Sequence, residues 1–105
     1  MKIGIDIQDV EKVKTLSVGT LARIFTSREL KYIESKNDSP QTVAGIWAAK
    51  EAYFKALGTG IQLSKLGEVE VNHDEYGAPF LVGMPNTSIS ISHSGSVSVA
   101  VCVIF

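Results

Sequence analysis

One long helical segment with marked ends constrains this chain more than any other feature. Ser39 followed by Pro40 is typical of a helix start, because a serine oxygen can accept from unpaired backbone N–H groups and proline has no N–H to leave unpaired. Gly58 suits the left-handed residue that closes a helix. We therefore predict one long helix that ends at Leu57.

Three ionisable side chains lie close together in the second half of this helix. Glu51 and Lys55 are four residues apart, so they are neighbours on one helical face. Lys50 lies in the middle of the apolar stripe, from which its long side chain can extend to water. The stripe consists of Val43, Trp47, Phe54 and Leu57. A solvated Glu–Lys pair, worth about 0.2–0.5 kcal/mol, is the simplest interpretation. Beside the glycine-rich exit Gly58-Thr59-Gly60, the cluster is also a candidate functional site.

The composition limits the classes of protein to which the chain can belong. A length of 105 residues indicates one domain, which we expect to span residues 1–105. A net charge of −1 argues against a general nucleic-acid-binding protein, because no basic surplus is available to neutralise phosphates. The single Cys102 excludes an internal disulfide. No apolar run is long enough to span a bilayer, so we expect no membrane partner and a cytoplasmic location.

The remaining segments predict an α+β fold with a mainly antiparallel sheet. Residues 1–7 alternate Ile3, Ile5 and Ile7 with Gly4 and Asp6, the pattern of a half-buried strand. Short helices are expected at 10–15 and 18–25, and a third begins after Thr26, which has capping-box spacing to Glu29. Strands are expected at 68–72, 80–82, 87–92 and 97–105, with hairpin turns at 74–77 and 93–96.

Two carboxylates could form a cation site in this arrangement. Asp6 lies on the strand face opposite the isoleucines, and Glu51 is the only acidic residue inside the long helix. Two carboxylates, together with phosphate oxygens and water, are the usual ligands of Mg²⁺. An ordinary exposed carboxylate is the alternative interpretation of Asp6.

His93 lies at the end of a predicted strand, between Ser92 and Ser94. These side chains could donate hydrogen bonds to a ligand above the sheet edge, although serine and glycine are also common in hairpin turns. A Ser–His hydrolase is disfavoured, because consecutive residues on a strand point to opposite faces.

Three segments with these residues, taken together, resemble the 4′-phosphopantetheinyl transferases, in particular the small holo-acyl-carrier-protein synthases. The strand motif of the family matches Gly4-Ile5-Asp6, Asp9 and Lys12. Its helix motif matches Trp47, Lys50-Glu51-Ala52, Lys55 and the exit Gly58-Thr59-Gly60-Ile61. Its closing motif matches Ser90-Ile91-Ser92-His93-Ser94, and a further segment matches Arg23-Ile24-Phe25-Thr26 and Glu29-Leu30. The likeness extends over essentially the whole chain.

The resemblance implies transfer of 4′-phosphopantetheine from coenzyme A to a serine of an apo acyl carrier protein, with release of 3′,5′-ADP. It implies that Asp6 and Glu51 hold Mg²⁺ and that Lys55 neutralises or protonates the leaving phosphate. Either Glu51 or a metal-bound water would accept the serine proton. The residues expected to contact coenzyme A are Lys50, Lys55, Gly60, Ser92, His93 and Ser94.

The resemblance also implies a carrier-binding surface and an assembly. The carrier proteins of the family are acidic, and Lys12, Arg23, Arg28 and Lys31 in the N-terminal helical segments are the candidates for a basic patch that contacts one, with a scatter of solvated charges as the alternative. Short members of the family form homotrimers with sites between subunits. Lys12 and Ile46 stand where relatives often have arginine, and the segment around residues 84–87 is short. A non-catalytic module that binds coenzyme A or a carrier, and a structural interaction domain without a ligand, are the competing hypotheses.

Overall fold

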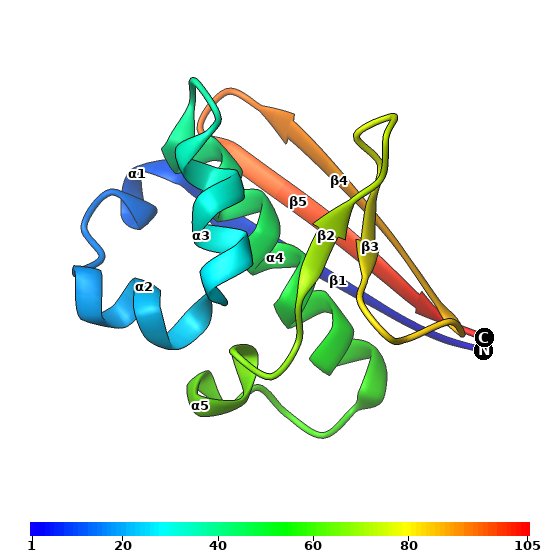
Figure 1. Ribbon diagram of the computed structural model, residues 1–105. Helices are drawn as coiled ribbons and strands as arrows, with labels where there is room; N and C mark the ends of the chain where they lie inside the picture. Colours follow the sequence, from blue (N-terminus) through cyan, green and yellow to red (C-terminus); the bar gives the residue numbers. More distant parts are fainter.

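An antiparallel sheet of three strands forms one layer of the molecule. The computed structural model describes residues 1–105, and the strands β1 (Lys2–Asp9), β5 (Val97–Ile104) and β4 (Thr87–Ser94) follow one another in that spatial order (Figure 1). A separate antiparallel pair consists of β2 (Val71–His73) and β3 (Pro79–Leu81). The predicted α+β class is confirmed. β4 continues through Ser94, so the turn before β5 is shorter than the sequence predicted.

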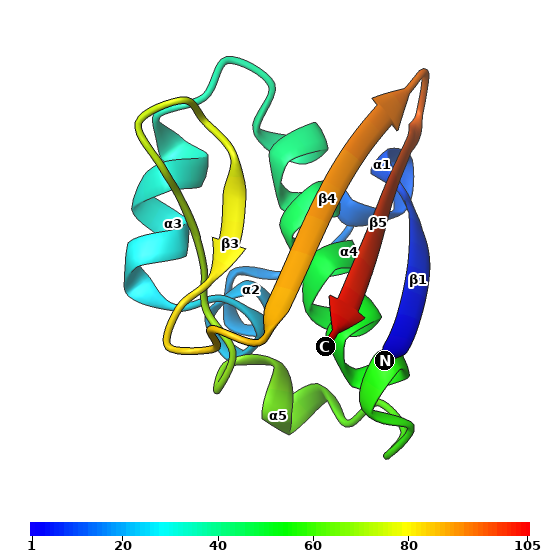
Figure 2. The ribbon, with the colours of Figure 1, turned by 90° about the vertical axis from the view of Figure 1, so that its right-hand side faces the viewer.

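The long helix α4 (Ser39–Leu57) lies across the inner face of this sheet (Figure 2). Its N-cap is Asp38, whose carboxylate accepts from the Gln41 N–H at 3.1 Å, so the expected cap at Ser39 is wrong by one residue. Gly58 has φ +77 and closes the helix as predicted.

Four shorter helices surround α4. They are α1 (Val10–Val13), α2 (Val18–Ile24), α3 (Ser27–Glu34) and α5 (Leu63–Leu66). Figure 1 shows α4 between the sheet and helices α2 and α3. The predicted capping box of α3 is confirmed, since Thr26 and Glu29 each accept from the other's backbone N–H. None of the helices combines the length and apolarity that a bilayer crossing requires.

Strand β1 exposes its large apolar side chains and buries its small and polar residues, the reverse of the usual pattern for a half-buried strand. Ile3, Ile5 and Ile7 are between 61% and 68% exposed, while Gly4 and Asp6 are buried towards α4. The reason is the close approach of β1 to the helix: a Cβ at position 4 would collide with the backbone of Ala52 and Ala56. A strand that packs this tightly must present its smallest residue to the helix.

The exposed isoleucines continue onto the central strand as an apolar outer face. In the β1–β5 register, Ile3, Ile5 and Ile7 lie opposite Val103, Val101 and Val99. These six residues form what we call the outer sheet face. The same register pairs Lys2 with Ile104, so the two ends of the chain lie side by side (Figure 1).

Candidate functional site

The packing of β1 on α4 brings Asp6, Glu51 and Lys55 together. Lys55 Nζ donates to Asp6 Oδ1 at 2.9 Å. The side chain of Lys55 is 45% exposed, whereas that of Asp6 is 7% exposed. Glu51 is partly buried one turn earlier on the same helix. Because all three residues belong to a strand or a helix, their positions are fixed by the fold.

Gln8 joins this group, which the sequence interpretation did not anticipate. Its Nε2 donates to Asp6 Oδ2 at 2.8 Å and to Glu51 Oε2 at 2.6 Å. Gln8 lies two residues after Asp6 on the strand, so both side chains point to the same face. That spacing was the signal available in the sequence. We call Asp6, Gln8, Glu51 and Lys55 the carboxylate cluster.

The carboxylate cluster has a charge distribution that suits a divalent cation. Burial, together with hydrogen bonding and repulsion from Asp6, raises the pKa of Glu51 to about 7. The positive charge of Lys55 opposes this rise in the pKa of Glu51, but its ammonium is bonded to Asp6 Oδ1, the oxygen that does not face Gln8. Oxygen donors with excess negative charge in a partly dry site are the chemistry that Mg²⁺ selects, so Asp6 and Glu51 fit this ion.

Lys50 lies elsewhere, and the expectation that it contacts coenzyme A is wrong. Its side chain has no exposed surface and forms an ion pair with the equally buried Glu29. Lys50 Nζ also donates to the carbonyl oxygens of Ile24 at 2.6 Å and Leu66 at 3.1 Å. Burial lowers the pKa of Lys50, although Glu29 acts in the opposite direction. The side chain does not extend to water but connects α4 to α2, α3 and α5.

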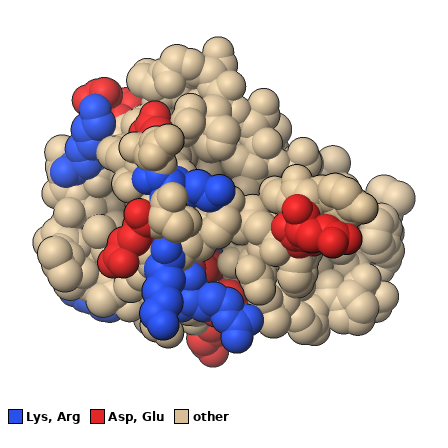
Figure 3. All heavy atoms as spheres, turned by 45° about the horizontal axis from the view of Figure 1, so that its top comes forward, with Lys and Arg blue, Asp and Glu red and all other residues tan.

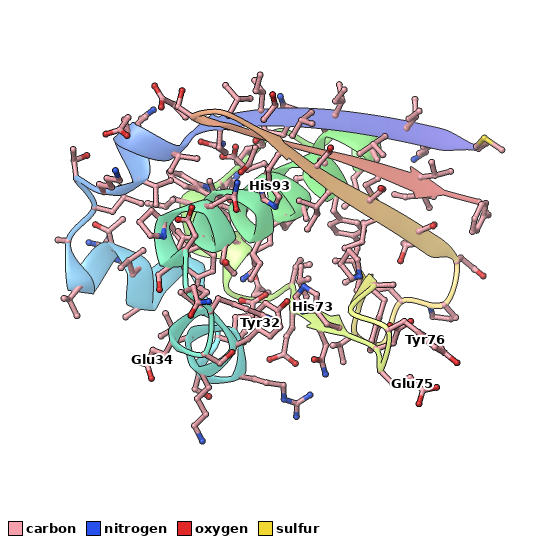
Figure 4. All side chains as sticks on the ribbon, turned by 90° about the horizontal axis from the view of Figure 1, so that it is seen from above. Tyr32, Glu34, His73, Glu75, Tyr76 and His93 are labelled. Carbon is pink, nitrogen blue, oxygen red and sulfur yellow. The ribbon has the colours of Figure 1, made fainter.

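His93 borders a cavity on the opposite side of α4. Its ring lies so close to Gly45 that a Cβ there would be 2.8 Å from Cε1, and its Nδ1 is 2.6 Å from Ser98 Oγ. The cavity, of about 180 Å³, is also lined by His73 and Tyr32. These two rings stack with centroids 3.8 Å apart (Figure 4), and neither was predicted as a site residue. Ser92 and Ser94 are exposed, on the other face of β4 from His93.

Within one chain, the structure does not bring His93 to the carboxylate cluster. Gln8, Ser98 and His93 occupy one row across the sheet, so the width of β5 separates the two outer residues. On the helix, Ile46 of the cavity and Glu51 are five positions apart, which is about 140° around the axis. The two candidate regions therefore face different sides of α4.

The other expected contacts lie on exposed surface. Gly60 has φ +80 in the loop after α4, and nothing lies within 4 Å of an added Cβ. The left-handed backbone conformation, and not a close contact, therefore explains why glycine stands at this position. Lys12, Arg23 and Arg28 are exposed on three different helices, and Arg28 pairs with Glu70 at 3.4 Å. Figure 3 shows basic side chains over the helical side of the molecule, interspersed with acidic ones.

Known proteins are similar to this chain in sequence and in fold. The family model described as the 4'-phosphopantetheinyl transferase superfamily matches residues 2–102. A holo-[acyl-carrier-protein] synthase of Caldicellulosiruptor bescii is 39% identical over 115 residues, which cover 96% of this chain and 94% of the relative.

Solved structures agree with the sequence comparison. A holo-(acyl-carrier-protein) synthase from Bacillus anthracis in complex with CoA (3',5'-ADP) superimposes with a TM-score of 0.87 at 35% identity, covering 98% of this chain and 94% of that chain. The Helicobacter pylori holo-[acyl-carrier-protein] synthase in complex with coenzyme A has a TM-score of 0.84 at 26% identity, with coverage of 98% and 99%. On these grounds the chain belongs to the 4′-phosphopantetheinyl transferase superfamily.

Proposed function

We propose that this protein is a holo-acyl-carrier-protein synthase, which transfers 4′-phosphopantetheine from coenzyme A to a serine of an apo acyl carrier protein. The observation that carries the proposal is the carboxylate cluster, in which two carboxylates and a lysine are held by a strand and a helix. Relatives at 39% and 35% identity carry the synthase name, and one of them was solved with CoA (3',5'-ADP).

Asp6 and Glu51 would hold the Mg²⁺ ion. When bound, the ion supplies positive charge that orients the diphosphate of coenzyme A and stabilises the charge that develops on it. The partial burial of Glu51 and the near-complete burial of Asp6 favour this role, because a desolvated pair of carboxylates gains most from a nearby cation.

Lys55 and Glu51 would assist the transfer itself. The serine oxygen forms a bond to the β-phosphorus, the bond from that phosphorus to the bridging oxygen breaks, and 3′,5′-ADP leaves. Lys55 lies beside Asp6 with nearly half of its side chain exposed, so its ammonium can neutralise the leaving phosphate. Glu51 is the side chain of the cluster that can accept the serine proton, and water is the alternative acceptor.

A second copy of the chain would complete the substrate site. His93 and the carboxylate cluster face different sides of α4, so one chain cannot offer both to one diphosphate. We propose a homotrimer that buries the outer sheet face and places His93, Ser92 and Ser94 of one copy near the carboxylate cluster of another. Gly60 would contact the coenzyme, and Lys12 and Arg23 the acidic carrier. The reaction would serve fatty acid biosynthesis in the cytoplasm.

The test is incubation of the purified protein with apo carrier protein, coenzyme A and Mg²⁺, followed by intact mass measurement of the carrier. The wild type should add one phosphopantetheine group, whereas Asp6→Asn and Glu51→Gln should add none while melting near the wild-type temperature. The exposed Glu68→Gln is the matched control and should keep full activity. A folded wild type that binds coenzyme A without modifying any carrier would instead be a binding module.

A further inference from the structure

We propose that Gln8 is a third protein ligand of the cation held by Asp6 and Glu51, through its amide oxygen Oε1. This inference rests on the metal site of the proposed function. It concerns an uncharged residue of β1 that was not among the predicted site residues. It follows from where the end of the Gln8 side chain lies.

The terminal amide of Gln8 lies in the gap between the two carboxylates. One atom, Nε2, is 2.8 Å from Asp6 Oδ2 and 2.6 Å from Glu51 Oε2. Lys55 binds the other Asp6 oxygen, Oδ1, and leaves Oδ2 to face Gln8. No third histidine, cysteine or carboxylate joins Asp6 and Glu51. Gln8 is therefore the additional donor that the chain brings to this gap.

These distances match the spacing of neighbouring ligands around one small cation. Octahedral Mg²⁺ binds oxygens at about 2.0–2.1 Å, so adjacent ligand atoms lie about 2.9 Å apart. The terminal atom of Gln8 stands at nearly this distance from both carboxylate oxygens at once. A cation between the carboxylates would thus have the end of the Gln8 side chain within its coordination distance.

Rotation of its terminal amide lets Gln8 bind the carboxylates in the metal-free protein and the cation in the metal-bound protein. Turning the terminal group by 180° exchanges Nε2 and Oε1 without moving the backbone. In the metal-free protein the N–H groups donate to both carboxylates, which reduces their repulsion. With a cation bound, the carboxylates bond to the metal, and the oxygen of the amide faces it. The β1–β5 pairing of Gln8 with Ser98 holds the strand in place during this exchange.

The experiment measures Mn²⁺ binding by electron paramagnetic resonance, without coenzyme A or carrier, because Mn²⁺ takes the same oxygen ligands as Mg²⁺. Gln8→Val removes the amide and suits a strand, and it should weaken binding roughly tenfold or more. Gln8→Glu returns an oxygen ligand with a charge and should bind at least as tightly as the wild type. Gln62→Val, at an exposed glutamine before α5, should leave binding unchanged. Melting curves establish that each variant is folded.

The outcomes separate this inference from the proposed function. If Asp6→Asn loses Mn²⁺ while Gln8→Val binds as tightly as the wild type, or more tightly, Gln8 only competes with the cation, and the inference is overturned. If Asp6→Asn itself keeps wild-type affinity, the metal site of the proposed function is wrong. Weakened binding in both variants, with unchanged binding in Gln62→Val, supports the third ligand.

Discussion

The ammonium of Lys50 and the carboxylate of Glu29 form an ion pair that water does not reach. Each group has further partners: Lys50 donates to two carbonyl oxygens, and Glu29 accepts from the Val71 N–H at 2.7 Å. A buried ion pair of this kind adds little net stability, but the removal of one partner leaves an unpaired charge in the core. Lys50 is adjacent in sequence to Glu51, so the core and the site share one stretch of helix α4.

We predict that Lys50→Met lowers the free energy of unfolding by about 3–5 kcal/mol, because Glu29 then remains buried without its cation. Urea unfolding followed by circular dichroism measures this loss. The double variant Lys50→Met with Glu29→Gln should recover part of it, since the glutamine is neutral and still has an oxygen for the Val71 N–H. An equal or greater loss in the double variant would contradict the role given to the charge.

His73 gives the stability a predictable dependence on pH. Burial, and to a lesser extent Lys36, lowers the pKa of His73 in the folded protein, so the unfolded chain takes up a proton first as the pH falls. Its contribution to stability is therefore present above about pH 6.5 and is lost as the pH falls through the lowered pKa. His73→Phe keeps a ring to stack on Tyr32 and cannot titrate.

Urea unfolding at about pH 7.5 and about pH 5 tests this prediction. Between these conditions the wild type should lose more free energy of unfolding than His73→Phe does. An identical loss in both proteins would mean that His73 has the same pKa in the folded and unfolded states.

At the scale of elements, the contact between β1 and α4 decides the geometry of the site. Gly4 lets the strand approach the helix, and Asp6 follows two residues later on the same face. Gly4→Ala should therefore separate the two elements, lower the free energy of unfolding by at least about 1–3 kcal/mol, and weaken Mn²⁺ binding at Asp6 and Glu51.

The matched control is Gly19→Ala on α2, where an added Cβ meets only Ser17 Oγ at 3.9 Å. Alanine also favours a helix over glycine, so Gly19→Ala should be neutral or stabilising. Both variants are compared by thermal melting and Mn²⁺ titration. Wild-type melting and Mn²⁺ affinity in Gly4→Ala would show that the strand can shift without moving Asp6.

The sequence predicted the elements better than the contacts between them. Helix α4 could be predicted from its apolar stripe and its closing glycine. The residue pattern alone left Asp6, Glu51 and Lys55 open to interpretation as ordinary surface charges, and only the family resemblance grouped them as one site. Alternation in β1 defines two faces but not which one is covered, and that choice depends on Gly4 meeting Ala52. Lys50 was misjudged because its partner Glu29 lies 21 positions away in the sequence, and no local pattern records such a pairing.

At the scale of the whole molecule, the outer sheet face is an apolar surface that a single chain leaves exposed. Exposed isoleucines on β1 lie beside valines on β5, and an apolar surface of this kind marks an interface between proteins. We predict that Ile5→Lys, at a residue 61% exposed in the single chain, converts the proposed homotrimer to monomers, because a lysine would be buried there without a partner.

Size-exclusion chromatography with light scattering measures the mass of the assembly. Val18→Lys, at an exposed apolar position on α2, is the control and should leave the mass unchanged. Ile5→Lys should also lose transfer activity while retaining Mn²⁺ binding, since the carboxylate cluster belongs to one chain. A wild-type mass for Ile5→Lys would place the interface elsewhere.

The pairing of β1 with β5 joins the first strand of the chain to one that is synthesised much later. Asp6 lies opposite Ala100, 94 positions later in the chain, and β5 is the only strand that β1 contacts in its sheet. The helix with Glu51 and Lys55 can form while the chain is still being translated, because its hydrogen bonds are local. β1 has no strand to pair with until β5 has left the ribosome, and pairing across so long a loop is slow. A nascent chain that stops before Val97 would contain every residue of the carboxylate cluster and still lack the strand that pairs with β1.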